Sequence, residues 1–196
     1  FDFVGLLIAA LAVRPFLYAA LLIELAVLIS IPLLIDAGRG ASRGLLRYIA
    51  YHTLGMPFIL FTGWMLAGVE ASPGQIDLVI RAGLLLGIGF AFLLAVVPFH
   101  TWMPLLIEEA RPYTAAFVIT FLSGFISVFA LTFLDRFVFL RTSDQLYLLL
   151  RGFGIVMTLV GATWIVFERD LGRMLGHALV LESGMVLLAV GLNTPE

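Results

Sequence analysis

Carboxyl groups inside long apolar runs are the residues of this chain best placed to do chemistry. Glu24 is flanked by isoleucine and leucine, and Glu182 lies within a mostly apolar stretch, residues 178–192. An ionised side chain at the centre of a membrane helix costs at least about 2.5–3.5 kcal/mol, so each carboxyl should face protein or water. Each could then take up and release protons. For Glu24 the alternative is a protonated carboxyl that only hydrogen-bonds to a neighbouring helix.

His100 lies where two prolines interrupt an apolar helical run. Pro98 and Pro104 each lack a backbone N–H, so each disrupts the helical turn before it. Carbonyls freed in this way are tolerated at membrane depth only where they meet protein or line a hydrated cavity. A histidine beside such a cavity could relay protons, because its ordinary pKa is about 6.5. The alternative is a proline kink at the membrane interface, with Trp102 as an aromatic anchor.

The other two histidines are weaker candidates for proton transfer. His52 follows Tyr48 by one helical turn, so the two side chains can meet and hydrogen-bond, and a histidine that only packs is the favoured interpretation. His177 precedes Glu182 by five residues, about 140° around a helix, so the two do not share a face. They could still be two stations of one water-filled path, although a structural hydrogen bond is an equal alternative for His177.

The composition indicates which elements position these residues. The chain is 62% hydrophobic and 12% charged, against about 25% charged residues in soluble domains, and its mean hydropathy is +1.13. We therefore expect an integral membrane protein that is all-α, because backbone groups in lipid must be satisfied within their own segment. There is no cysteine, and the three histidines lie in separate segments, so we expect no cofactor and no metal. The net charge of −2 indicates no nucleic-acid partner.

Charged residues, glycines and prolines separate the apolar runs of residues 1–196. We expect these runs to be the helices of a single transmembrane domain. We expect about six full transmembrane helices plus a partial one at the start, with one helix broken by proline. The chain begins at Phe1, without an initiator Met, and we expect it to be a fragment. The expected segments are 3–13 (partial), 16–35, 45–69, 78–97 with a short second half at 105–110, 114–134, 145–167 and 171–192.

Arginine counts predict the orientation of these helices. All eleven basic residues are arginines, and the links on one side hold more of them than the links on the other. The positive-inside rule places the richer side in the cytoplasm. That side holds Arg39, Arg43, Arg47, Arg111, Arg169 and Arg173, and the other holds Arg14, Arg81, Arg136 and Arg141.

Three stretches resemble one known family. The run Pro98-Phe99-His100-Thr101-Trp102-Met103-Pro104 resembles the Pro-Phe-His-x-Trp-Leu-Pro signature of the antiporter-like membrane subunits of respiratory complex I. That family also includes subunits of Mrp-type sodium/proton antiporters and of membrane-bound hydrogenases. Glu24-Leu25 is similar to the Glu-Leu of the family's fifth helix. Residues 170–177, followed by Ser183-Gly184, are similar to the family's Asp-Leu-Lys-Arg and Ser-His-Met-Gly pattern.

The resemblance implies helices four to ten of a fourteen-helix subunit, which form part of an inverted-repeat antiporter-like fold with its ion path near the midplane. Glu24 matches the family's glutamate and His100 its signature histidine. The lysine that precedes the signature in the family is Leu93 here, and the lysine before Arg173 is Gly172. The lysine of the family's eighth helix falls near 124–126, and Glu182 stands where the family often has histidine.

The function implied is proton translocation coupled to electron transport, in a complex I-like NADH:quinone oxidoreductase or a related hydrogenase complex. The subunit would hold no redox centre of its own. Its partners would be other membrane subunits, the lipid bilayer, and protons or sodium, in a prokaryotic inner membrane. The first alternative is an Mrp-type sodium/proton antiporter subunit, in which Glu24 and Glu182 supply oxygen ligands for sodium. The second is a structural subunit that no longer pumps, as the absence of lysine suggests. The expected proton path comprises Glu24, His52, His100, His177 and Glu182.

Overall fold

The computed structural model describes residues 2–13, 16–35, 42–71, 76–136 and 144–192, and within these ranges the chain is helical without strands. The predicted all-α class is therefore confirmed for this part of the chain. The helices, in order, are α1 (Asp2–Ala12), α2 (Phe16–Leu34), α3 (Arg43–Ala71), α4 (Ile76–Leu93), the short 3₁₀ helix η1 (Phe99–Thr101), α5 (Trp102–Glu109), α6 (Pro112–Arg136), α8 (Asp144–Phe167) and α9 (Leu171–Leu192).

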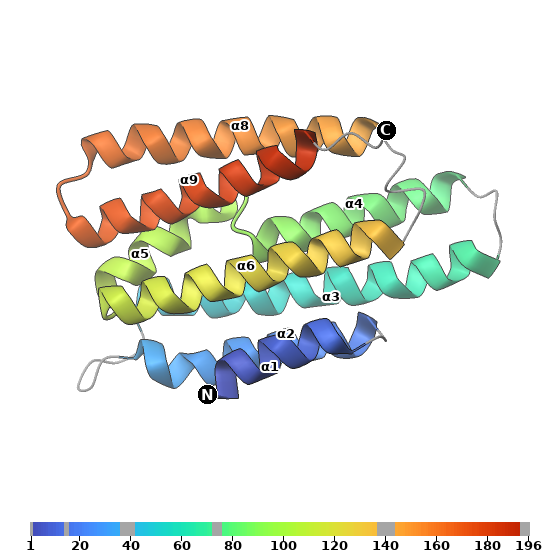
Figure 1. The fold of residues 1–196 in the computed structure, drawn as a ribbon, viewed down its shortest axis with the longest axis horizontal. Helices are drawn as coiled ribbons and strands as arrows, with labels where there is room; N and C mark the ends of the chain where they lie inside the picture. The colour runs from blue at the N-terminus through green and yellow to red at the C-terminus, as the bar shows by residue number, and fades with distance from the viewer. Residues whose placement is uncertain (1, 14–15, 36–41, 72–75, 137–143, 193–196) are drawn as a thin grey trace.

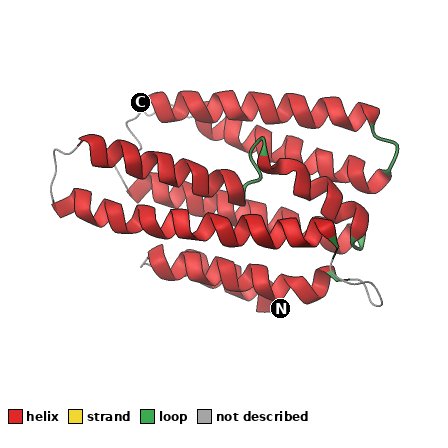
Figure 2. Ribbon diagram, turned by 180° about the vertical axis from the view of Figure 1, so that it is seen from behind, coloured by secondary structure: helices red, strands yellow, loops and turns green. Residues whose placement is uncertain are grey.

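The helices lie side by side with their axes roughly aligned. The pair α1 and α2 forms one edge of the bundle and the pair α8 and α9 forms the other, with α3, α4 and α6 between them (Figures 1 and 2). The short helix α5 packs against both α3 and α9. It therefore connects the two halves of the bundle.

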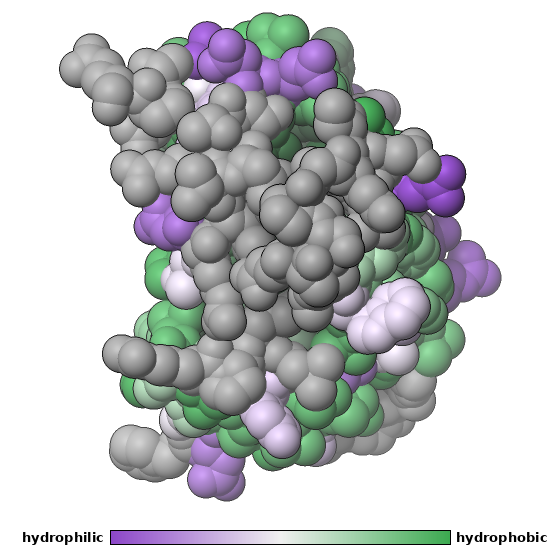
Figure 3. All heavy atoms as spheres, turned by 90° about the vertical axis from the view of Figure 1, so that its right-hand side faces the viewer, coloured by the Kyte–Doolittle hydropathy of each residue, from purple (hydrophilic) through white to green (hydrophobic). Residues whose placement is uncertain are grey.

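Four of the described helical segments are long and apolar enough to cross a membrane: Arg43–Leu66, Pro112–Asp135, Asp144–Phe167 and Leu171–Leu192. Three others are apolar but shorter, Asp2–Ala12, Tyr18–Leu34 and Ile80–Leu93. The integral membrane character is consistent with these spans, whereas the predicted count of six full spans is not confirmed within the described residues. Seen end-on, the visible flanks are largely hydrophobic, and hydrophilic residues form separate groups (Figure 3).

Small residues allow the helices at the α8–α9 edge to approach closely. A Cβ added at Gly154 would lie 2.6 Å from the backbone nitrogen of Leu188, and one at Gly184 would lie 2.7 Å from that of Thr158. Glycine at these crossings brings the two backbones into contact, as is common between membrane helices. The antiparallel pair is therefore positioned by backbone packing rather than by long side chains.

The predicted helix break is present, but it is shorter than expected. α4 ends at Leu93, not at 97, and Ala95 has a positive φ of 51°, which is uncommon for a residue other than glycine. Pro98 lies in the break, as predicted. Pro104 does not: it lies in the first turn of α5, where a helix needs no N–H from it. For the same reason the second half of the broken helix starts at Trp102 rather than at 105.

Arginines gather at one end of the bundle. α2, α5 and α8 end there and α3, α6 and α9 begin there (Figure 1). We call it the arginine-rich end, and it holds Arg43, Arg47, Arg111, Arg169 and Arg173. The predicted grouping of these links on one side is therefore confirmed, while Arg39 lies outside the described residues.

Candidate functional site

Glu24 faces the neighbouring helix α3. Its side chain is half-buried, and its Oε1 accepts a hydrogen bond of 2.8 Å from the hydroxyl of Thr53. The second oxygen, Oε2, is buried and meets no hydrogen-bond donor among the described residues. The carboxyl is thus directed toward protein, as its cost in lipid requires, but only half of it is satisfied.

His52 lies at the centre of the bundle and is fully buried. Its Nδ1 is 2.8 Å from the backbone carbonyl of Tyr48, one turn earlier. The predicted hydrogen bond between the two side chains is absent, because the Tyr48 hydroxyl instead lies 2.8 Å from the hydroxyl of Ser30 in α2. The ring centroids of His52 and Trp102 are 5.2 Å apart. Nε2 of His52 is buried and has no hydrogen-bond partner in the described part of the chain.

His100 and Trp102 bring the broken helix to the same region. His100 is half-buried in η1, with a buried Nδ1 that makes no hydrogen bond to any described residue. Trp102 is only 1% exposed. It is therefore a core residue, and the alternative prediction that it anchors the chain at the membrane interface is wrong. Its ring lies 5.3 Å from that of Tyr48, centroid to centroid. His100 therefore lies in the break between α4 and α5, and α5 packs against both α3 and α9.

His177 in α9 lies on the other side of the break. It is 8% exposed, its ring stacks on Trp164 of α8 at 6.1 Å, and its Nδ1 is buried and unpaired within the described structure. The other ring nitrogen, Nε2, faces Glu168 at 3.7 Å.

These four ionisable side chains come from four different elements and each has a buried nitrogen or oxygen without a protein partner among the described residues. We call the set of Glu24, His52, His100 and His177 the polar row. The elements that carry it run from α2 at one edge of the bundle to α9 at the other, with α3 between them (Figure 1). Buried polar atoms are almost always hydrogen-bonded to protein or ordered water. These four atoms therefore need partners that the described residues do not supply.

Glu182 does not join the polar row. It is exposed on α9, on a face that it shares with the exposed residues Met185 and Val186, while His177 is buried. The angle of about 140° predicted between Glu182 and His177 explains the difference. Glu24 and Glu182 lie at opposite edges of the bundle, so the two carboxyls do not form a common sodium site.

The positions that correspond to the family's lysines hold residues that pack closely. Leu93 is fully buried at the end of α4, where a Cβ on Gly55 of α3 would lie 3.1 Å from its side chain. A Cβ on Gly172 would lie 3.2 Å from the Cα of Glu108 and 3.3 Å from the carbonyl of Ile107 in α5. A side chain at 172 would therefore have to push α9 away from α5.

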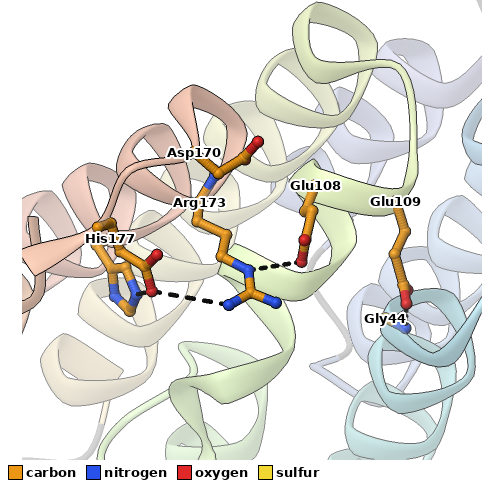
Figure 4. Close-up of polar contacts among 7 residues, drawn as sticks. Gly44, Glu108, Glu109, Asp170, Arg173 and His177 are labelled. Atoms are coloured by element: carbon orange, nitrogen blue, oxygen red, sulfur yellow. Dashed lines mark hydrogen bonds and ion pairs between the residues drawn. The ribbon is translucent and has the colours of Figure 1, made fainter.

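A charged cluster at the arginine-rich end joins α5 to the start of α9 (Figure 4). Nε of Arg173 donates to Glu108 at 2.6 Å, and Asp170 caps α9 by accepting the backbone N–H of Arg173 at 2.9 Å. Arg173 is also 3.9 Å from Glu168. Next to this cluster, Glu109 accepts the backbone N–H of Gly44 at 2.6 Å and so ties α5 to α3.

Sequence reasoning missed this cluster because its members lie in a charged link or near the end of an expected helix, where solvated side chains are the ordinary expectation. The available signal was the spacing of Asp170 and Arg173, which is that of an N-cap and the third residue of a helix. The partner of Arg173 in α5, Glu108, could not be found in this way, since it lies 65 residues away.

Comparison of the sequence with known proteins identifies its family. Residues 65–196 match the sequence profile of the family described as NADH:quinone oxidoreductase/Mrp antiporter, TM. Among curated proteins, the chain is 33% identical over 135 residues to NADH-quinone oxidoreductase subunit N of Chromohalobacter salexigens, covering 67% of this chain and 24% of the relative. It is 28% identical over 182 residues to subunit N of Rhodococcus opacus, covering 81% of this chain and 33% of that protein.

A subunit M also matches. NADH-quinone oxidoreductase subunit M of Buchnera aphidicola subsp. Baizongia pistaciae is 23% identical over 121 residues, covering 59% of this chain and 23% of the relative. The alignments thus span about a quarter to a third of the length of these relatives. No solved structure matches the chain. Since the family profile covers two thirds of the sequence, including the broken helix and α9, this chain belongs to the NADH:quinone oxidoreductase/Mrp antiporter transmembrane family.

Proposed function

We propose that the chain is part of a proton-translocating, antiporter-like subunit of a complex I-like NADH:quinone oxidoreductase, and that protons move along the polar row. The names of its relatives support the assignment to such a complex. The observation that carries the proton path is that Glu24, His52, His100 and His177 each hold a buried polar atom with no protein partner in the described structure.

The physical argument for transport rests on what these atoms require. A buried nitrogen or oxygen without a partner loses its hydrogen bond to water at a cost of about 1–3 kcal/mol. Water molecules that bridge such atoms remove this cost and also form a chain along which protons can pass. Histidine suits the middle of that chain, because each imidazole can accept a proton at one nitrogen and release one from the other. The polar row therefore has atoms that require internal water and side chains that can exchange protons with that water.

In this proposal the positive charge that acts beside Glu24 comes from a different residue type than in the family. The family pairs its glutamate with lysines, and the matching positions here are the buried Leu93 and the tightly packed Gly172. The cation that forms transiently beside Glu24 would be an imidazolium of the polar row. His52 is the nearest candidate along the chain, because it directly precedes Thr53, the hydrogen-bond partner of Glu24. A structural subunit without transport is the second candidate function, and Leu93 is the residue that favours it.

Glu182 supports the presence of neighbouring membrane subunits. It is exposed near the middle of α9 among exposed apolar side chains, including Met185 and Val186. A carboxyl at that depth facing lipid is unfavourable by a few kcal/mol, so a polar group of an adjacent membrane helix is the expected neighbour. We assign this face of α9 to contact with another membrane helix of the complex.

The test uses the complete complex that contains the chain, reconstituted in vesicles and driven by NADH and a quinone. Glu24→Gln should reduce proton translocation per electron pair, because the amide cannot exchange a proton, while assembly remains intact. Glu24→Asp keeps a carboxyl and should retain more of the activity. Unchanged translocation in the Gln variant would reject the proton role of Glu24 and favour the structural subunit.

A further inference from the structure

Glu168 directly follows the last residue of α8 and lies between a surface arginine and a buried histidine. Its Oε1 is 3.9 Å from a terminal guanidinium nitrogen of Arg173 and 3.7 Å from Nε2 of His177. Both separations exceed the usual length of a hydrogen bond. The carboxylate is therefore held near both groups and bonded tightly to neither.

The side chains around Glu168 form a gradient of exposure at the arginine-rich end. The relative exposure of the side chains falls from 42% for Arg173 to 32% for Glu108, 19% for Glu168 and 10% for His177. Glu168 is thus the acidic group that connects the exposed ion pair to the buried histidine. Beyond His177, the polar row continues with His100 in η1.

Arg173 is kept in place independently of Glu168. Its guanidinium donates to Glu108 at 2.6 Å, and its backbone N–H is bound by Asp170. Close packing fixes α9 against α5 at the same point, because a Cβ on Gly176 would lie 2.8 Å from the backbone nitrogen of Pro104. The arginine therefore provides a fixed positive charge 3.9 Å from the Glu168 carboxylate, which lies 3.7 Å from His177 on its other side.

We propose that Glu168 transfers protons between the aqueous phase at the arginine-rich end and His177, the last member of the polar row. This inference rests on the proton-translocating function proposed above and adds a residue to it. The charged and titratable groups that face this exchange are Arg173, Glu108, Asp170 and His100.

The transfer balances in three steps and needs no oxidant or reductant. A proton from water binds the Glu168 carboxylate and makes it a neutral acid. The acid passes this proton to Nε2 of neutral His177, directly or through one water, and becomes a carboxylate again. The imidazolium then releases its Nδ1 proton toward His100, and exchange with water, which takes the Nε2 proton and returns one to Nδ1, restores the starting tautomer.

The experiment compares two carboxyls that share Arg173 but differ in their contact with the histidine. In the reconstituted complex driven by NADH and a quinone, Glu168→Gln should lower proton translocation per electron pair at least about tenfold, as expected for loss of a positioned acid–base group. Glu168→Asp should restore most of it. Glu108→Gln removes the closer partner of Arg173 and should stay within roughly twofold of the unmodified complex, because an exposed ion pair contributes little.

All translocation rates are normalised to the amount of assembled complex, so that poor folding is not read as lost transport. Equal effects of Glu168→Gln and Glu108→Gln would overturn the role of Glu168. If Glu24→Gln blocks translocation in the same preparation, the proposed function would survive that result. If neither Glu24→Gln nor Glu168→Gln lowers translocation, the proposed function and this inference both fail.

Discussion

Gly176 makes the tightest glycine contact between α9 and α5, and its replacement gives a sharp prediction. A Cβ on Gly176 would lie 2.8 Å from the backbone nitrogen of Pro104 and 3.0 Å from its Cβ. Backbone atoms cannot rotate away as the end of a flexible side chain can. In Gly176→Ala, α9 must therefore move away from α5 by roughly 1 Å to reach ordinary contact distances of about 3.5–4.0 Å.

The expected cost follows from two opposing effects. Overpacking of this kind typically costs about 1–3 kcal/mol. Replacing a helical glycine with alanine also gains about 1 kcal/mol in helix propensity. Gly152→Ala in α8 is the matched control, because a Cβ there meets nothing within 4 Å. The propensity gain is common to both variants, so the difference between them should equal the overpacking cost of about 1–3 kcal/mol.

The assay is the thermal midpoint of the purified complex in detergent, measured in parallel for both variants. The midpoint of Gly176→Ala should lie below that of Gly152→Ala. Its proton translocation should also fall, because α9 carries His177 away from His100 in η1. Equal midpoints and equal translocation in the two variants would show that α5 and α9 are not in the close contact described above.

Three further substitutions test single interactions. Asp170→Ala should lower the free energy of unfolding by about 1 kcal/mol through loss of the α9 cap, whereas Asp170→Asn should retain most of it; equal losses measured by thermal midpoint would contradict the capping role. Tyr48→Phe should cost about 0.5–1.5 kcal/mol through loss of its hydrogen bond to Ser30, with translocation unchanged; a translocation defect would place the hydroxyl on the proton path. Glu182→Leu should reduce co-purification of neighbouring membrane subunits, while Met185→Leu on the same face should not; unchanged recovery would mean that this face meets lipid.

Sequence patterns predicted the general architecture well. Apolar runs of sufficient length predict helices irrespective of tertiary contacts, and the segments 114–134, 145–167 and 171–192 each fall within a described helix. The break at Pro98 was predictable because a proline inside a helix removes a hydrogen bond wherever the helix lies. Pro104 was placed wrongly, since the same residue is tolerated in a first turn and only the actual start of α5 distinguishes the two cases.

The candidate site was predicted less completely, because it depends on contacts between distant helices. Glu24, His52, His100 and His177 could be chosen by residue type and depth, yet their arrangement in one row across four elements has no signature in the sequence. Glu182 satisfied the same criteria and nevertheless lies on the exposed face of α9. Depth in an apolar run indicates that a carboxyl needs a partner, but it does not indicate on which side of the helix that partner lies.

The most direct test of the central claim is whether the two ends of the polar row act on the same protons. Proton translocation per electron pair should be measured in the reconstituted complex for Glu24→Gln, for His177→Gln and for the double variant. If both residues belong to one path, the double variant should translocate no less than the more impaired single variant, because residues that act as a unit are non-additive. A double variant whose loss equals the product of the two single losses would contradict a single path through the polar row.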